Sequence, residues 1–289
     1  MELDTVTHAL FGLVLYHAIE RKDLSKDAAR SLLFVSVAGS EIPDIDVVSQ
    51  LWDRGGEYLM WHRGITHSLF LVPLWAALLT AMAHLIWRVY DKRLFAVGLL
   101  AVFIHITIDI FNPWGTGYWE PFSQKRLALG TIPIIDLVMW GIILGGFLAA
   151  RFGSWPRHTV FRTVACLLLL QVASQTAQGL VIQKSLAGRY DQVTLAADFF
   201  PGSYKVIGKK GNEVEITQAS LWSEPILLKR LTSAEGTDLT PLFTQNPEAQ
   251  TLYRWAPMVV IVNNEQRLGI YDPRFYQRGE SFLYEYIEK

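Results

Sequence analysis

The sequence predicts a mainly α-helical, polytopic membrane protein that ends in a soluble, strand-rich α+β domain. Of its 289 residues, 51% are hydrophobic and only 18% are charged, whereas soluble domains carry about 25% charged residues. Apolar segments of roughly 20 residues, the length that crosses a bilayer as a helix, follow one another between residues 65 and 182. After about residue 184, polar and apolar positions alternate instead, which is typical of β-strands.

The long apolar segments are expected to be four transmembrane helices. They comprise residues 65–87, 94–111, 132–150 and 160–182, of which the last is the most polar. Two shorter apolar pieces, residues 9–19 and 31–39, precede them. Each of the two is short for a full crossing, so we expect a short N-terminal helical hairpin that is tilted or half-inserted. Residues 1–183 are therefore predicted to form one membrane-embedded helical domain.

Basic residues in the connections predict the orientation of this domain, because Lys and Arg concentrate in cytoplasmic loops. If the two short pieces also cross, ten basic residues fall on one side of the membrane and four on the other. The ten lie between the two short pieces, after the first long segment, and between the third and fourth. That side is predicted to be cytoplasmic. If one short piece does not cross, the opposite orientation follows.

Residues 184–289 are predicted to form a separate soluble domain rich in strands. The stretch "VIVNNEQRLGIYD" places β-branched residues beside Asn263 and Asn264, which is typical of a β-hairpin. On the charge argument, this domain and the metal site described below lie on the non-cytoplasmic face of the membrane.

Composition argues against several other kinds of protein. The net charge of −1 gives no support to nucleic-acid binding, for which a basic surface is expected. The single cysteine, Cys166, leaves no intrachain disulfide and no cysteine-based metal cage. The stretch "MELDTVTH" contains acidic residues and no basic region, so a cleaved signal peptide is not expected.

Seven residues of types that bind metal ions occur near ends of the predicted helices. "THALFG" contains His8, "PDID" contains Asp44 and Asp46, "HRGITHS" contains His62 and His67, and "HITID" contains His105 and Asp109. His105 and Asp109 are four apart, which places them on one face of a helix as a workable chelating pair. In an extended segment, Asp44 and Asp46 would also share one face. If both short pieces cross, all seven residues fall at one membrane face, so we predict that they form one site.

The number and type of these residues predict a site for two divalent metal ions. A catalytic zinc takes about three protein ligands, so seven His and Asp residues suit two ions that share a carboxylate. Nitrogen and oxygen ligands without sulfur are compatible with zinc, manganese or iron. Asp44 or Asp46 is the candidate bridging ligand, and one of them is a candidate general base. Arg63 is the candidate for binding an anionic transition state, and Gly64 beside it would let the backbone approach closely.

Other polar residues near these segments are further candidates. Asp136 lies at the same predicted face, either as another ligand or as a partner that orients a histidine. Glu41 and Glu120 are similar possibilities. Thr66 and Ser68 are candidates for hydrogen bonds to ligands or for helix caps. The histidines that lie away from the predicted site, and are not expected to be ligands, are His17, His84 and His158.

Taken together, the motifs resemble the YdjM-like family of bacterial inner-membrane proteins, which are predicted to be metal-dependent hydrolases. The resemblance rests on "THALFG", "PDID", "HRGITHS", "HITIDIFNPWGT" and "EPFS", in that order over residues 5–123. It implies a multi-pass protein of the bacterial inner membrane with a metal site formed by His8, Asp44, Asp46, His62, His67, His105 and Asp109. A more distant similarity, to zinc-dependent phospholipase C and single-strand nucleases, implies phosphoester hydrolysis. The chain has no second His-x-x-x-Glu helix after Asp109, and this departure argues against the three-metal site of those enzymes.

The residues and the resemblance together predict a membrane-bound hydrolase that uses a metal-activated water. Because the site is expected at the membrane edge, the expected substrate is a phosphoester or other ester in a lipid or lipid-linked molecule, and the expected partner is the lipid bilayer. Two alternatives use the same ligands: a metal-ion transporter or sensor, and a membrane scaffold or regulatory protein with a structural metal site. Transport sites lie near the bilayer midplane, whereas these ligands cluster near helix ends, which favours an enzyme. A structural site would have no open coordination position.

Overall fold

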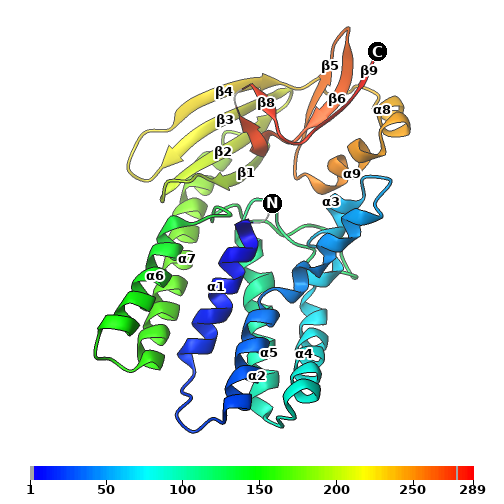
Figure 1. Ribbon diagram of the computed structural model, residues 1–289. Coiled ribbons are helices and arrows are strands. Elements are labelled where there is room, and N and C mark those ends of the chain that lie inside the picture. The colour runs from blue at the N-terminus through cyan, green and yellow to red at the C-terminus, as the bar shows by residue number, and fades with distance from the viewer. Residues whose placement is uncertain (1–2, 278) are drawn as a thin grey trace.

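A bundle of helices carries a β-rich domain at one of its ends (Figure 1). The computed structural model describes residues 3–277 and 279–289. The long helices of the bundle are α1 (Leu3–Ala18), α2 (Lys26–Gly39), α4 (Val72–Trp87), α5 (Lys92–Ile108), α6 (Leu137–Phe152) and α7 (Arg157–Ala187). The α1–α2, α4–α5 and α6–α7 connections lie at the end of the bundle away from the β-rich domain (Figure 1). The other connections therefore meet at the near end, together with the helix ends that carry His8 and His105. A helical N-terminal part followed by a strand-rich domain is confirmed.

In the part of the chain that the structure describes, three helical segments are long and apolar enough to cross a membrane. They are Leu69–Trp87, Lys92–Phe111 and Arg157–Ala187. The helix α6 is apolar but has 16 residues, fewer than the roughly 20 that a crossing needs, so the predicted count of four spans is not confirmed. It begins later than expected because the Asp136 side chain caps it, accepting hydrogen bonds from the backbone of Val138 and Met139.

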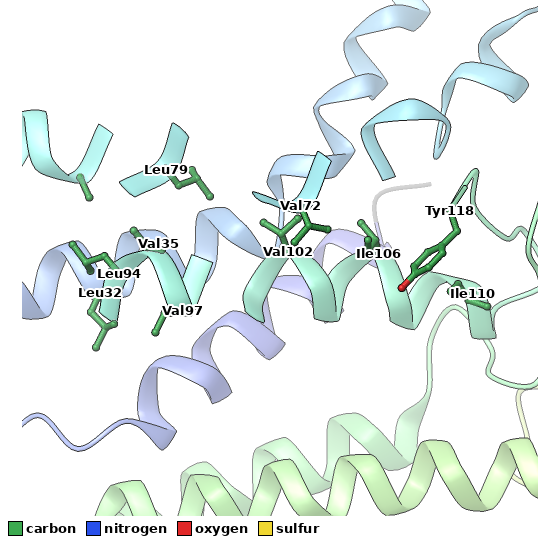
Figure 2. Packing of buried hydrophobic residues seen from close by; sticks show 11 residues of the cluster. Leu32, Val35, Val72, Leu79, Leu94, Val97, Val102, Ile106, Ile110 and Tyr118 are labelled. Carbon is green, nitrogen blue, oxygen red and sulfur yellow. The ribbon is translucent and has the colours of Figure 1, made fainter. Parts of the chain in front are cut away.

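The N-terminal hairpin is formed by α1 and α2, with 16 and 14 residues, which pack on each other. Close contact between α2, α4 and α5 depends on small side chains. A Cβ atom added at Gly98 would lie 3.3 Å from both Ala76 Cβ and Val35 Cγ1. Around this contact, a buried apolar cluster follows α5 along its length (Figure 2); its residues are Leu32, Val35, Val72, Leu79, Ala83, Leu94, Val97, Val102, Ile106, Ile110 and Tyr118. This packing positions the near ends of α2 and α5, which lead into the site.

The connection between α2 and α4 consists mostly of short helical turns: η1 (Ile42–Leu51), α3 (Tyr58–Trp61), η2 (Ile65–His67) and η3 (Leu69–Leu71). Two expectations about this region were wrong. Asp44 and Asp46 lie on the 3₁₀ helix η1 rather than in an extended segment, because Pro43 occupies its first turn and favours helical backbone angles there. The helix α4 begins at Val72 rather than near residue 65, because Ser68 is extended and caps η3.

Among the described residues, the β-rich domain contains three antiparallel sheets, of four, three and two strands, and two α-helices. The strands β1 (Gln192–Ala197), β2 (Ser203–Lys210), β3 (Glu213–Ser220) and β4 (Ile226–Thr232) form one sheet in that order. The second sheet has β5 (Val260–Asn263), β6 (Arg267–Tyr271) and β9 (Tyr284–Glu288), and α8 (Thr240–Gln245) and α9 (Pro247–Trp255) pack beside it. Shorter pieces are η5 (Pro273–Phe275), β7 (Tyr276–Gln277) and β8 (Glu280–Ser281). The predicted hairpin is confirmed, since Asn263 of β5 pairs with Leu268 of β6.

The helix α7 connects the two parts of the molecule without a break. It has 31 residues and ends at Ala187, beyond the boundary predicted at residue 183. Its Ile182 and Leu186 are buried in one cluster with Leu195 of β1 and with Tyr204 and Val206 of β2. The last turns of an apolar helix therefore belong to the core of the β-rich domain.

Candidate metal centre

Four side chains converge where the helical bundle meets the β-rich domain. Asp44 comes from η1, His67 from η2, His105 from α5, and Asp109 from η4 (Asp109–Phe111), which directly follows α5. One potential ligand atom from each lies within 4.8 Å of the other three. His67, His105 and Asp109 are at most 1% exposed. Segments that are far apart in the sequence thus form a single buried cluster.

The separations between these atoms match the size of a metal ion. His67 Nε2 lies 3.1 Å from His105 Nε2, 3.2 Å from Asp44 Oδ1 and 3.4 Å from Asp109 Oδ2. His105 Nε2 lies 3.6 Å from Asp44 Oδ1 and 3.7 Å from Asp109 Oδ2. Metal–ligand bonds of about 2.0–2.2 Å in a tetrahedron place the ligand atoms roughly 3.3–3.6 Å apart. The four residues present therefore fit one tetrahedral ion.

The polar atoms that face the centre of the cluster also fit a cation. Among the described residues, Asp44 Oδ1 and Asp109 Oδ2 are buried and accept no hydrogen bond of ordinary geometry. Buried charged oxygens without such partners are costly. His105 Nδ1 lies 2.6 Å from the carbonyl oxygen of Ser40, so it carries the proton and donates, which leaves the lone pair of Nε2 directed at the cluster. Two oxygens and a ring nitrogen thus direct lone pairs at one point.

The carboxylates that surround His67 change its pKa. Burial alone would lower the pKa of His67, but its contacts with Asp109, Asp44 and Asp46 raise that pKa to about 10. Burial would likewise raise the pKa of Asp44, yet His105 and His67 hold it well below its usual range. The carboxylates around His67 therefore favour positive charge at this point of the structure.

Asp46 and His62 form a second group beside the first. His62 Nδ1 lies 2.8 Å from Asp46 Oδ1. Asp46 Oδ2 accepts hydrogen bonds from the backbone N–H of Arg63, at 2.9 Å, and from Thr66 Oγ1, at 2.5 Å. It also lies 3.5 Å from His67 Nδ1. Asp44, Asp46 and His62 make up another possible ligand set, but both oxygens of Asp46 already have hydrogen-bond partners.

His8, Arg63 and Asn112 surround the other oxygen of Asp109. Their distances to Asp109 Oδ1 are 3.4 Å from His8 Nε2, 3.5 Å from Arg63 Nη2 and 3.2 Å from Asn112 Nδ2. The His8 ring stacks on His105 with centroids 3.9 Å apart. His8 therefore lies next to the four-atom cluster rather than within it. A cavity of about 20 Å³ adjoins His8, Asp109 and Asn112, which is room for about one water molecule.

The other candidates have mixed outcomes. Thr66 binds a ligand-type carboxylate and Ser68 caps a helix, as predicted. Asp136 lines the small cavity, but its oxygens cap α6 and accept from Gln171 and Gln175 rather than orienting a histidine. Gly64 is needed for a local reason, since a Cβ there would lie 2.8 Å from the carbonyl oxygens of Met60 and Trp61. Burial raises the pKa of Glu120. In the described part of the chain, the ligand groups do not include Glu41, Glu120, His17, His84 or His158.

Three supporting residues were not anticipated from the sequence. Ser40 accepts the hydrogen bond that orients His105, and Asn112 donates to Asp109. The partly buried guanidinium of Arg126 donates to the carbonyl oxygens of Met60, His62 and Arg63, and so stabilises the turn that carries two of the histidines. Asn112 lies in the motif that contains His105 and Asp109, which was the only signal for it. Ser40 acts through its backbone, which no side-chain pattern reveals.

The fold and the site together define a class of protein. It is a membrane protein with a buried cluster of His and Asp residues that could hold a metal ion. The chain belongs to the family described as YdjM inner membrane protein, whose model matches residues 3–180. The resemblance predicted from the motifs is thus confirmed.

A relative of known sequence is the uncharacterized protein YfhP of Bacillus subtilis (strain 168), which is 37% identical over 139 residues. That match covers 46% of this chain and 42% of the relative, so it spans less than half of either protein. No solved structure matches this chain.

Proposed function

We propose that this protein is a membrane-bound, metal-dependent hydrolase whose metal ion is held by Asp44, His67, His105 and Asp109. The observation that carries the proposal is the spacing of 3.1–3.7 Å between the histidine Nε2 atoms and the other ligand atoms. Two nitrogens and two oxygens suit zinc, manganese or iron. A second ion at Asp44, Asp46 and His62 is also part of the prediction, and it would have to replace the 2.8 Å contact between His62 and Asp46.

A divalent ion at this position would supply Lewis-acid chemistry, lowering the pKa of a water molecule and polarising an ester oxygen. The chain's own residues would do the rest. Asp46 holds His67 through the Nδ1 side of the ring, which directs Nε2 toward the cluster, and it is our candidate for the general base. Arg63 brings a positive charge next to Asp109 and would stabilise negative charge that develops on the substrate.

The surroundings of the cluster support a lipid or lipid-linked substrate with a phosphoester or other ester. The helix η1 carries Asp44 and Asp46, yet it also exposes apolar side chains. Ile45 is 51% exposed, Val47 46% and Leu51 85%. Exposed apolar groups on a turn at the edge of a membrane protein are favoured when they contact lipid. An acyl chain lying against η1 would bring its ester or phosphate group close to the two aspartates.

Metal content and hydrolysis, measured on the same detergent-purified samples, test this function. We expect elemental mass spectrometry to find one or two equivalents of a divalent metal in the wild type, and far less in Asp109→Asn. His84→Ala is the matched control, because His84 lies in α4 away from the described ligand groups. Hydrolysis of bis-p-nitrophenyl phosphate, of p-nitrophenyl esters and of a phospholipid panel would be compared for the same three proteins. A wild type that binds no zinc or manganese after reconstitution would refute the proposal.

A structural metal site is the second candidate, and the number of ligands favours it. Four protein ligands close a tetrahedral site, whereas catalytic zinc sites commonly have three and an open position. In that case the protein would bind metal and lose thermal stability on chelation, yet hydrolyse none of the substrates. The same two measurements, together with a melting curve in the presence of EDTA, separate this role from the enzymatic one.

A further inference from the structure

One end of the four-stranded sheet carries exposed apolar side chains that the hydrolase site does not use. We call Phe199, Phe200, Leu221 and Trp222 the aromatic patch. Phe200 is 72% exposed and Trp222 is 84% exposed. The two loops that carry the patch, β1–β2 and β3–β4, lie at the same end of the sheet, because Ser203 pairs with Ser220. Large apolar groups gathered in this way usually mark an interaction surface.

Contacts with α7 place this end of the sheet against the side of an apolar helix. The backbone N–H of Gly202 donates to Gln175 Oε1 at 3.0 Å, and the Tyr204 hydroxyl donates to the Gln175 carbonyl oxygen at 2.6 Å. A Cβ atom at Gly202 would lie 3.1 Å from Gln178 Oε1 and 3.8 Å from Trp222 Nε1. The aromatic patch therefore lies beside α7 at the level of Gln175 and Gln178, well before the helix ends at Ala187.

The position of Gln175 along α7 corresponds to the edge of the hydrocarbon layer of a bilayer. At 1.5 Å per residue, the helix rises about 27 Å from Arg157 to Gln175, close to the ~30 Å hydrocarbon thickness of a bilayer. Gln175 also donates to Asp136, the residue that caps the start of α6, so the near end of α6 lies at the same height. On the part of α7 before Gln175, Leu169 and Leu170 are 71% and 65% exposed. The aromatic patch therefore lies at about the height where a bilayer that begins at Arg157 would end.

We propose that the aromatic patch inserts into the interfacial layer of the bilayer and docks the β-rich domain on the lipid surface. Phe and Trp are suited to this layer, where large rings contact acyl chains and the indole N–H remains among polar groups. Asp198 and Glu224 are the charged residues in the two loops, and both are acidic. The attachment is therefore driven by apolar burial rather than by attraction to anionic lipid. It also restrains the domain at the end of the bundle that holds the candidate metal centre, whatever reaction that centre performs.

Depth-dependent fluorescence quenching in nanodiscs tests the proposal on the full chain. Trp222→Cys and Phe200→Cys, each in a Cys166→Ala background, would be labelled with the environment-sensitive NBD group. The matched control is Glu265→Cys, an exposed position in the turn between β5 and β6, which points away from the helices (Figure 1). Nanodiscs would contain phosphatidylcholine alone or with nitroxide-labelled phosphatidylcholine.

We expect blue-shifted emission and loss of most NBD fluorescence to nitroxide lipid at positions 222 and 200, and neither effect at position 265. The same result should be obtained without anionic lipid and at high salt. Emission typical of water at both patch positions would overturn the proposal. A blue shift without quenching by nitroxide lipid would also overturn it, because the patch would then contact protein, such as a second copy of the chain. Neither readout depends on metal or hydrolysis, so the outcome is independent of the proposed activity.

Discussion

Replacing His105 with asparagine is the most direct test of the candidate metal centre. The Asn side-chain amide can reach the position of Nδ1 and keep a donor for the Ser40 carbonyl oxygen, but it has no atom at the position of Nε2. The substitution therefore removes one of the four ligand atoms while the hydrogen bond of 2.6 Å to Ser40 is preserved. His105 is fully buried, so solvent cannot supply a replacement ligand easily.

The expected loss can be worked out from the four-ligand geometry. Structural zinc sites bind with about 10–16 kcal/mol. Divided among four ligands, this is about 2.5–4 kcal/mol for each, or a roughly 100- to 1000-fold increase in Kd. Competition with a chromophoric zinc chelator in detergent would measure it.

The control for this experiment is His84→Ala, whose Nδ1 lies 3.4 Å from the Val89 carbonyl oxygen near the far end of α4. We expect His84→Ala to bind zinc as the wild type does. Circular dichroism would confirm that His105→Asn is folded. If a folded His105→Asn protein binds zinc as tightly as the wild type, the assignment of this cluster as the metal centre is refuted.

Three further predictions concern residues that support the site and the β-rich domain. In Arg274→Met, Asp272 would lose the guanidinium that now lies 2.6 Å away, and both side chains are at most 2% exposed. Breaking a buried pair costs about 3–5 kcal/mol. Thermal melting should therefore show Arg274→Met to be less stable than the double variant that also carries Asp272→Asn. In Asn112→Leu, Asp109 Oδ1 loses its 3.2 Å donor, and zinc affinity in the chelator assay should fall about 10- to 100-fold; an unchanged affinity would show that Asn112 does not support the ligand. In Asp53→Asn, the side chain that accepts from the backbone of Gly55, Glu57 and Tyr58 loses its charge. Partial burial opposes ionisation of Asp53, but those donors lower its pKa below the usual 3.8. The stability that the Asp53 carboxylate contributes to the fold is therefore complete above pH 3.8 and is lost as the pH falls through the lowered pKa. The Asn oxygen can still accept these hydrogen bonds, but bonds to a neutral acceptor are weaker than bonds to a carboxylate, so Asp53→Asn should be less stable by about 1 kcal/mol at pH 7. The melting difference should shrink in acid; a difference that persists at low pH would contradict this account.

Sequence reasoning was most successful where chemistry is local. The four-residue interval between His105 and Asp109 placed both on one helical face, and they form an i, i+4 pair at 3.7 Å. The prediction that the ligands meet required only an alternation of helix directions, and the bundle has that alternation (Figure 1). The backbone around Asp44 and Asp46 was predicted wrongly, because the effect of Pro43 on the first turn of η1 was not considered.

The sequence by itself determined which residues are available to bind metal, that part of the chain is apolar enough for a membrane, and that a strand-rich domain follows. These properties depend on residue type and on short spacings, which are visible in a linear chain. Only the tertiary structure decided that Asp44, His67, His105 and Asp109 share one point while Asp46, His62 and His8 surround it. It also placed the Ser40 carbonyl oxygen on His105 and the aromatic patch beside α7. The physical reason is that such contacts join residues tens of positions apart, and packing of the helices sets those distances to within an ångström.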